Sequence, residues 1–222
     1  MKNIVLRNFE NIRREIAPFN PVIIAVTKYG GLQNIVDAYQ AGLRDFAESR
    51  VSGEVVEKIN SLPEHVRNDS RFHLIGHLQT NKVKKAVANF NLIHSVDSLR
   101  LAQAISTEAQ RIGKVQKILI QVNNASEVQK FGFSEKDLMA QFKEICELPG
   151  IEILGLMNMA PYKSTEVELE FIFKDLARIK SQIERTYSVT LPELSMGMSN
   201  DYVVAARTGA TMLRIGSRLF NN

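Results

Sequence analysis

The run Val22-Ile23-Ile24-Ala25-Val26-Thr27, which ends immediately before Lys28, decides the fold. Its short length and β-branched residues favour a buried strand over a helix. Seven further runs resemble it: Leu43 (LRDFA), Arg71 (RFHLI), Asn91 (NLIHSV), Lys117 (KILIQV), Glu152 (EILGLM), Pro192 (PELSM) and Met212 (MLRI). The sequence therefore predicts eight strands.

The stretches between these runs have the apolar spacing of helices. The clearest example consists of Leu169, Ile172, Leu176, Ile179 and Ile183, separated by three or four residues. Such a stretch predicts a helix that packs one apolar stripe against a sheet. Buried strands alternating with helices are typical of a parallel sheet, and eight such units can close into a barrel. We therefore expect an α/β protein: a single (β/α)8 TIM-type barrel over residues 1–222, with an extra N-terminal helix from Asn3 to Ala17.

An open doubly wound sheet is the alternative fold. The dinucleotide-binding form of that fold carries a G-x-G-x-x-G motif after its first strand. Here only Gly30 and Gly31 follow the first predicted strand. The closed barrel is therefore favoured.

Composition limits the function classes. The chain has 222 residues, of which 45% are hydrophobic and 23% charged, which excludes a disordered chain. Its surplus of four positive charges suits many anions and selects none of them. No apolar run is long enough to span a membrane and no secretory signal precedes the first strand, so we expect a cytoplasmic protein without a membrane partner. Cys146 is the single cysteine and, in an apolar helical stretch, is expected to be an inert core residue.

Polar residues gather where the predicted strands end. In a (β/α)8 barrel the chemistry lies at the carboxyl ends of the strands. Lys28 ends the first strand there, and a partly desolvated lysine can act as a nucleophile toward aldehydes. The alternative interpretation is that Lys28 merely leaves the strand into solvent.

The segments after the seventh and eighth strands predict a phosphate site. Barrels commonly bind phosphate there through backbone N–H groups. Ser199 precedes a predicted helix from Tyr202 to Arg207, Gly216 permits close backbone approach, and Ser217 adds a hydroxyl. Ser199 as a simple helix cap and Gly216 as a turn residue remain alternatives. The eighth strand neighbours the first in a closed barrel, so the phosphate site and Lys28 would share one rim.

An imine-forming lysine beside a phosphate site indicates a phosphorylated aldehyde. Pyridoxal 5′-phosphate (PLP) is one class and phosphosugars are the other. Arg214 favours PLP, because an arginine facing the pyridine nitrogen holds that nitrogen neutral and weakens the ring as an electron sink. A phosphate contact or a surface ion pair is the alternative role for Arg214. Met196, at the end of the seventh strand, is expected to form an apolar wall for the cofactor.

Other motifs give weaker evidence of function. His73 and His77 have helical metal spacing, but His73 lies in a predicted strand, so no metal site is expected. The phosphate loop G-x-x-x-x-G-K-S and the nucleophile elbow G-x-S-x-G are absent from the sequence. The basic run from Gln79 to Lys85 is interpreted as a solvated helix face, and we expect no nucleic-acid partner.

Stretches along nearly the whole chain resemble the pyridoxal phosphate homeostasis protein family, also called the YggS or PROSC family. They are 25–28 (AVTK), 72–82 (FHLIGHLQTNK), 94–98 (HSVDS), 121–123 (QVN), 130–133 (KFGF), 155–157 (GLM), 194–199 (LSMGMS) with Asp201, and 209–216 (GATMLRIG). The resemblance implies a PLP-binding barrel related to that of alanine racemase.

The resemblance also implies residue roles. Lys28 falls on the family's Schiff-base lysine, Arg214 on the arginine at the pyridine nitrogen, and Ser199, Gly216 and Ser217 on its phosphate binders. We add His73 and Ser49 to the expected cofactor-binding set. The family usually has Asn at the position of Ser49, Gly at Ala47 and Thr at Ser217, and its C-terminal residues differ from 220–222 of this chain.

The expected function is non-catalytic: PLP held as a Schiff base on Lys28, for PLP homeostasis and delivery to PLP-dependent apoenzymes, by a monomer. A racemase of the related fold takes a second base from another domain, which 222 residues do not provide. Two enzyme alternatives are a small racemase and an imine-forming phosphosugar aldolase. A nucleic-acid or protein adaptor acting through Lys82, Lys84 and Lys85 is a third hypothesis. Lys82 or Lys130 is considered as a second imine site.

Overall fold

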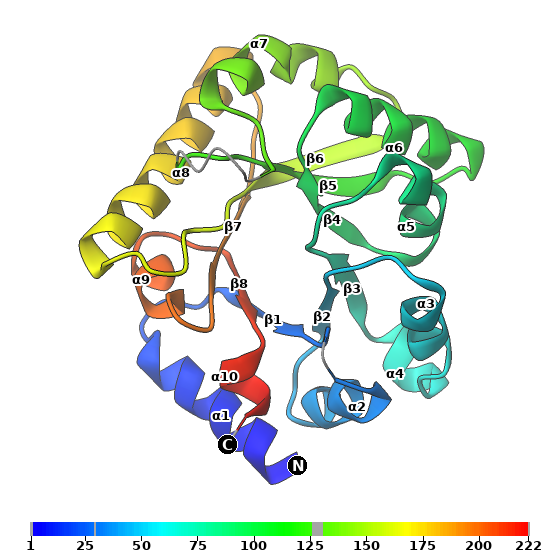
Figure 1. The fold of residues 1–222 in the computed structure, drawn as a ribbon, viewed down its shortest axis with the longest axis vertical. Coiled ribbons are helices and arrows are strands. Elements are labelled where there is room, and N and C mark those ends of the chain that lie inside the picture. The colour runs from blue at the N-terminus through cyan, green and yellow to red at the C-terminus, as the bar shows by residue number, and fades with distance from the viewer. Residues whose placement is uncertain (1, 29, 126–130, 222) are drawn as a thin grey trace.

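The protein folds as a closed barrel of eight parallel strands, as the computed structural model shows (Figure 1). The model describes residues 2–28, 30–125 and 131–221. The strands are β1 (Val22–Val26), β2 (Asp45–Glu48), β3 (Arg71–Leu74), β4 (Leu92–Val96), β5 (Gln116–Gln121), β6 (Ile151–Met157), β7 (Glu193–Met198) and β8 (Met212–Ile215). They follow chain order around the barrel, and β8 pairs with β1 to close it. Each of the eight predicted runs overlaps one of these strands, so the predicted barrel is confirmed.

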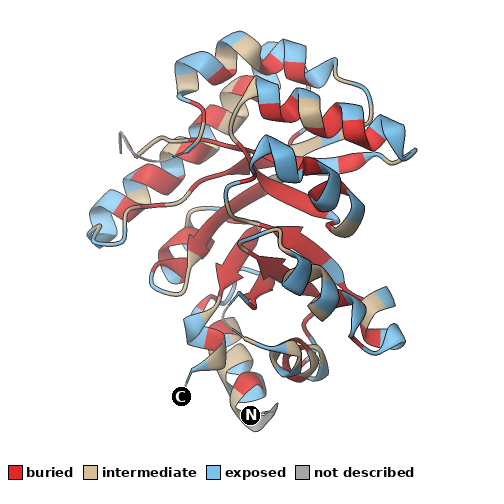
Figure 2. Cartoon of the chain, turned by 45° about the vertical axis from the view of Figure 1, so that its right-hand side comes forward, coloured by how far each residue is buried: buried red, intermediate tan, exposed pale blue. Residues whose placement is uncertain are grey.

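Helices cover the outside of the barrel. They are α1 (Lys2–Glu15), α2 (Leu32–Gln40), α3 (Gly53–Asn60), α4 (Glu64–Asn68), α5 (Val83–Asn89), α6 (Leu99–Arg111), α7 (Glu135–Cys146), α8 (Glu166–Tyr187), α9 (Tyr202–Arg207) and α10 (Ser217–Phe220), with a 3-10 turn η1 (Thr80–Lys82). Figure 2 shows their buried faces turned toward the strands and their exposed faces turned to solvent. This is the arrangement that amphipathic helices predict.

The predicted extra N-terminal helix is α1, which packs beside α10 and α2 (Figure 1). The side chain of Asn8 donates hydrogen bonds to the carbonyls of Leu219 and Asn221, at 3.1 and 2.9 Å. These bonds hold the last turn of the chain, next to the phosphate site that the sequence predicts.

Two apolar cores result from the alternation of side chains along each strand. The larger core lies between sheet and helices, and the smaller one lies inside the barrel. The interior cluster contains Ile24, Val26, Ala47, Leu92, Leu119, Met157 and Met212. The rest of the interior is polar and contains the buried side chains of Asp45, His73, His94, Ser195 and Arg214.

Cys146 corrects one expectation. It is exposed rather than in the core. The buried stripe of α7 is formed by Leu138, Phe142 and Ile145, so Cys146 lies just beyond its edge. Among the described residues, no helix combines the length and apolar character needed to cross a membrane.

Candidate functional site

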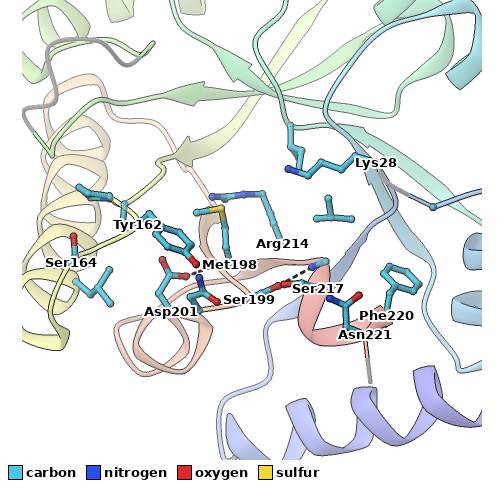
Figure 3. Close-up of a pocket in the computed structure, with 18 of the residues that line it drawn as sticks. Lys28, Tyr162, Ser164, Met198, Ser199, Asp201, Arg214, Ser217, Phe220 and Asn221 are labelled. Carbon is cyan, nitrogen blue, oxygen red and sulfur yellow. Dashed lines mark hydrogen bonds between the residues drawn. The ribbon is translucent and has the colours of Figure 1, made fainter.

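A cavity of about 480 Å³ opens at the carboxyl ends of the strands (Figure 3). Its walls come from β1, β7, β8, the segment between β6 and α8, and the C-terminal turn. The described residues that line it are Val26, Lys28, Gly30, Asn34, Ile75, Ala160, Pro161, Tyr162, Ser164, Leu169, Met198, Ser199, Asn200, Asp201, Arg214, Gly216, Ser217, Phe220 and Asn221. The structure therefore brings together Lys28, Arg214, Ser199, Gly216 and Ser217, five of the residues selected from the sequence.

Lys28 enters the cavity from the end of β1 (Figure 3). The segment that carries it is held by Lys58 of α3, whose Nζ donates to the carbonyls of Thr27 and Gly30 at 3.1 and 3.2 Å. Lys58 also forms an ion pair of 2.5 Å with the buried carboxylate of Glu48. Lys28 itself is exposed at the rim rather than enclosed.

Arg214 lies on β8, which pairs with β1, the strand that leads to Lys28. This pairing places Arg214 beside Ile24 on the interior face of the barrel. Its guanidinium donates to Ser195 Oγ and to the carbonyl of Asn158, both at 2.7 Å. Burial lowers the pKa of Arg214 to about 10, and the charge of Asp201 opposes this shift. Arg214 is therefore a buried cation at neutral pH whose two hydrogen-bond acceptors are uncharged.

Ser199 and Ser217, two of the residues predicted to bind phosphate, lie along the lower edge of the cavity in Figure 3. Ser199 Oγ accepts hydrogen bonds from the backbone N–H groups of Gly216 and Arg218, at 3.2 and 3.3 Å. Because its oxygen accepts twice, the hydroxyl hydrogen of Ser199 is available to donate to a ligand. Ser217 adds a second hydroxyl to the cavity wall.

Asp201 is the one carboxylate among the described lining residues. Burial raises its pKa, and its Oδ1 accepts a 2.5 Å hydrogen bond from the Met198 backbone N–H. It therefore fixes the turn that carries Ser199. From the sequence, Asp201 is only the residue before a predicted helix. Its position shortly after a strand end is the signal that could have indicated a role in the site.

Three expected cofactor-binding residues do not line the cavity. Met196 is buried in the helix layer, whereas Met198 lines the cavity, because the register shift between Ser195 and Met198 interrupts the regular alternation of β7. Ser49 follows β2, and its carbonyl packs so tightly under Gly76 that a Cβ there would lie 2.0 Å from the oxygen. His73 is buried inside the barrel below the cavity, where it contacts Asp45 and His94.

The basic run and the histidine pair also lie apart from the cavity. Lys82, Lys84 and Lys85 are exposed on η1 and α5 and are not lining residues. Lys130 lies outside the described residues. His77 contacts Asp97 at 2.9 Å, and within the described ranges no group of three His, Cys, Asp or Glu side chains could hold a metal ion.

Sequence reasoning missed Tyr162, Asn158 and the acceptor role of Ser195. Tyr162 lies on the cavity wall after β6, which its position beyond a strand end could have indicated. Asn158 contributes a backbone carbonyl, and residue type gives no signal for that.

The groups around the cavity define the ligand chemistry. An amine, a guanidinium and two hydroxyls offer hydrogen bonds to an anion, while one oxygen of the Asp201 carboxylate accepts from the Met198 N–H. Apolar side chains complete the walls: Val26, Ile75, Leu169 and Met198. This set fits a phosphorylated, flat aldehyde whose carbonyl carbon the Lys28 amine can attack.

Comparison with known proteins agrees with this geometry. The family model of the alanine racemase N-terminal domain matches residues 3–221. The pyridoxal phosphate homeostasis protein of Synechocystis sp. is 38% identical, with 90% of each chain covered. That of Aquifex aeolicus is 40% identical over 84% of this chain and 80% of its own.

Solved structures show the same fold. PipY of Synechococcus elongatus, in a structure with PLP bound, has a TM-score of 0.88 at 34% identity, covering 98% of this chain and all of its own. Alanine racemase of Clostridium difficile shares the fold alone, with a TM-score of 0.79 at 14% identity; 99% of this chain covers 57% of that one. The chain therefore belongs to the alanine racemase N-terminal domain family and, within it, to the pyridoxal phosphate homeostasis proteins.

Proposed function

We propose that this chain binds PLP, holds it as a Schiff base on Lys28, and serves PLP homeostasis and delivery to apoenzymes without catalysing a reaction. The observation that carries the proposal is the shared cavity of Lys28, Arg214 and the Ser199 and Ser217 hydroxyls. The PLP-bound structure of PipY, at 34% identity, supports it. So do the names of the homeostasis proteins to which the chain is similar.

Each group has a distinct task in this proposal. The Lys28 amine would form the imine with loss of water, and the Ser199 and Ser217 hydroxyls would donate to the phosphate, while the Gly216 N–H holds Ser199 in place. Arg214 donates toward the pyridine nitrogen. PLP supplies an electron sink when its ring nitrogen is protonated. A guanidinium that retains its own proton does not protonate that nitrogen, so Arg214 favours holding the cofactor over carbanion chemistry.

A cytoplasmic location is part of the proposal. Cys146 is exposed and is the single cysteine of the chain, so it has no internal disulfide partner. A lone exposed thiol suits a reducing compartment.

The test is a titration of the purified apoprotein with PLP, followed by absorption in the visible range. Wild type is expected to develop an imine band, and Lys28→Ala is expected to lack it. Lys143→Ala is the matched control, because Lys143 is an exposed lysine on α7 outside the cavity. An imine band of normal intensity in Lys28→Ala would overturn the assignment of Lys28.

A second assay separates a carrier from an enzyme. Amino acids are incubated with the PLP-loaded protein in heavy water, and exchange of the α-hydrogen is followed by NMR. We expect no Lys28-dependent exchange. Turnover that disappears in Lys28→Ala would contradict the non-catalytic role and support a racemase.

A further inference from the structure

A continuous row of polar side chains crosses the barrel interior below the cavity. Asp45, His73, His94, Ser195 and Arg214, from β2, β3, β4, β7 and β8, are each at most 5% exposed. The interior of such barrels is usually filled by branched apolar side chains. A buried polar row is expensive unless every member is hydrogen-bonded, so its bonding pattern is strongly constrained.

Each link of the row is a hydrogen bond. Arg214 Nη1 donates to Ser195 Oγ at 2.7 Å, and Ser195 Oγ lies 2.9 Å from His94 Nδ1. His94 Nε2 lies 2.9 Å from His73 Nδ1, and His73 Nε2 lies 3.0 Å from Asp45 Oδ1. Arg71 closes the far end with two 2.6 Å bonds to the Asp45 carboxylate.

The two ends determine the direction of every bond between them. A guanidinium only donates and a carboxylate only accepts. Because the Asp45 carboxylate only accepts, His73 donates to it from Nε2, and a neutral His73 then accepts at Nδ1 from His94 Nε2. A neutral His94 is left with an acceptor at Nδ1, to which Ser195 donates its hydrogen while its oxygen accepts from Arg214. In this arrangement both imidazoles are neutral and every hydrogen in the row has an acceptor.

An added proton breaks the pattern. Protonated His94 would direct an N–H from Nδ1 at the Ser195 hydroxyl, whose hydrogen would lose its acceptor. Protonated His73 would force His94 into its other tautomer, with the same consequence. Burial, together with the charge of Arg214, lowers the pKa of His94 well below its ordinary value, in agreement with a neutral ring; a proton on His73 would lower it further.

The charges at the two ends are stable at neutral pH. Burial alone would raise the pKa of Asp45, but hydrogen bonds from His73 and Arg71 lower it to about 2. Asp201, which lines the cavity, is the carboxylate whose charge acts on Arg214. The row therefore links the Asp45 carboxylate, at the start of β2, to the Arg214 guanidinium, which lines the cavity, through neutral side chains.

We propose that Asp45, His73, His94 and Ser195 are positioning residues for Arg214, and that their one-directional hydrogen-bond chain holds its guanidinium fixed at the cavity, where it would donate toward the ring nitrogen of a bound cofactor. This inference rests on the proposed function for its consequence, though not for its geometry. The chain keeps a lone pair of Ser195 aimed at Arg214 Nη1. Ring binding should therefore depend on residues that never touch the ligand.

The direct test is the tautomeric state of the histidines in the apoprotein. Long-range ¹H–¹⁵N spectra of the histidine rings at pH 7 are expected to place the proton of His73 and that of His94 on Nε2. The exposed His65 and His77 provide reference signals in the same sample. A proton on His94 Nδ1, or a doubly protonated His73 at pH 7, would overturn the chain. This result does not depend on whether PLP binds.

A second test compares Ser195→Ala with ligands that do or do not carry the phosphate. Loss of the Ser195 hydroxyl leaves Arg214 Nη1 without its acceptor, so the affinities for PLP and for unphosphorylated pyridoxal should both fall about tenfold. An unchanged affinity for both ligands, or a loss confined to PLP, would contradict the positioning role.

The exposed end of the row supplies a control. The Arg71 side chain is 60% exposed, and Arg71→Gln leaves Asp45 bonded to His73. The affinities for PLP and pyridoxal should therefore stay within about twofold of wild type. If Ser195→Ala does not fold, the spectra of wild type still decide the proposal. If wild type does not bind PLP at all, the proposed function fails while the tautomer measurement remains valid.

Discussion

At the scale of single residues, the site separates two kinds of recognition. Arg214 and Lys28 approach the cavity from neighbouring strands, whereas Ser199, Gly216 and Ser217 form the edge at which we propose that the phosphate binds. Ser199 is central to that edge because its oxygen joins two backbone N–H groups and its hydrogen remains for the ligand. The two halves should therefore be separable by substitution.

Ser199→Ala tests the phosphate half. A hydrogen bond to a charged group contributes about 1.5–3 kcal/mol, so the affinity for PLP should fall by at least about tenfold. The affinity for pyridoxal, which has no phosphate, should be unchanged. Equilibrium titration with both ligands measures the difference.

Ser181→Ala is the control for that substitution. The Ser181 hydroxyl donates to the carbonyl of Ala177 within α8, away from the cavity. Equal losses for PLP and pyridoxal in Ser199→Ala would show that Ser199 holds the turn and does not recognise phosphate.

At the scale of elements, α3 holds the segment that carries Lys28. The Lys58 ammonium bonds two carbonyls of residues 27–30 and the carboxylate of Glu48 at the end of β2. Glu48 is buried, with 3% of its surface exposed. Removing Lys58 would therefore leave a buried carboxylate without its cation.

Lys58→Met should lower the free energy of unfolding by about 3 kcal/mol, because a buried charge loses its partner. The double variant Lys58→Met with Glu48→Gln should recover part of this loss. Urea unfolding measures both. Lys143→Met, which removes an exposed pair of 3.9 Å with Glu147, should change stability by less than about 1 kcal/mol. A similar loss in both lysine variants would refute the role of burial.

Thr165 starts α8 with a capping box. Its backbone N–H donates to Glu168 Oε2 at 2.7 Å, and its hydroxyl oxygen accepts from the Glu168 N–H at 3.4 Å. Thr165→Ala should lower the free energy of unfolding by about 1 kcal/mol, while Thr165→Ser should retain it. Thermal unfolding is the measurement.

A mid-helix threonine distinguishes capping from loss of a hydroxyl. Thr107 lies within α6 and bonds the carbonyl of Gln103. Thr107→Ala should be neutral or slightly stabilising, because alanine has the higher helix propensity. A loss of stability as large as that of Thr165→Ala would argue against the cap.

The helices and strands are the features of this fold that the sequence predicts best. Period-two and helical spacing are local, so all eight strands and the α8 stripe could be recognised. The face of the sheet on which a side chain lies is harder to predict. Met196 and Met198 are two residues apart, yet the register shift along β7 and β8 places only Met198 at the cavity. The prediction for Cys146 was wrong for a similar reason, because Cys146 lies one position beyond the buried stripe of α7.

At the scale of the whole molecule, contacts between distant strands lie beyond sequence reasoning. His94 and Ser195 are 101 residues apart, and His73 and Asp45 are 28 apart. Strand ends identified Lys28, Ser199 and Arg214, because position along a strand is a local property. Which side chains meet inside the barrel depends on its closure, which no local pattern encodes.

The buried histidine makes the stability of the molecule depend on pH. The folded chain keeps His94 neutral, whereas the unfolded chain binds a proton there near pH 6.5. Acid therefore favours unfolding, and His94 should contribute a loss of about 1 kcal/mol per pH unit below pH 6. The contribution of Asp45, whose pKa is lowered to about 2, is present above pH 4 and is lost only below it.

Urea unfolding at pH 7, 6 and 5 measures this slope. His94→Gln should unfold at lower urea but show a smaller decrease from pH 7 to pH 5. The exposed His65 offers the control His65→Gln, which should keep the slope of wild type. An identical slope in His94→Gln would contradict a neutral, buried His94.

The central claim is a covalent attachment of PLP at one lysine. The measurement is borohydride reduction of the PLP complex, followed by digestion and peptide mass spectrometry. We predict a pyridoxyl group on the peptide containing Lys28 and none on the peptides containing Lys82 or Lys130. An unlabelled Lys28 peptide, or a label on another lysine in its place, would contradict the account.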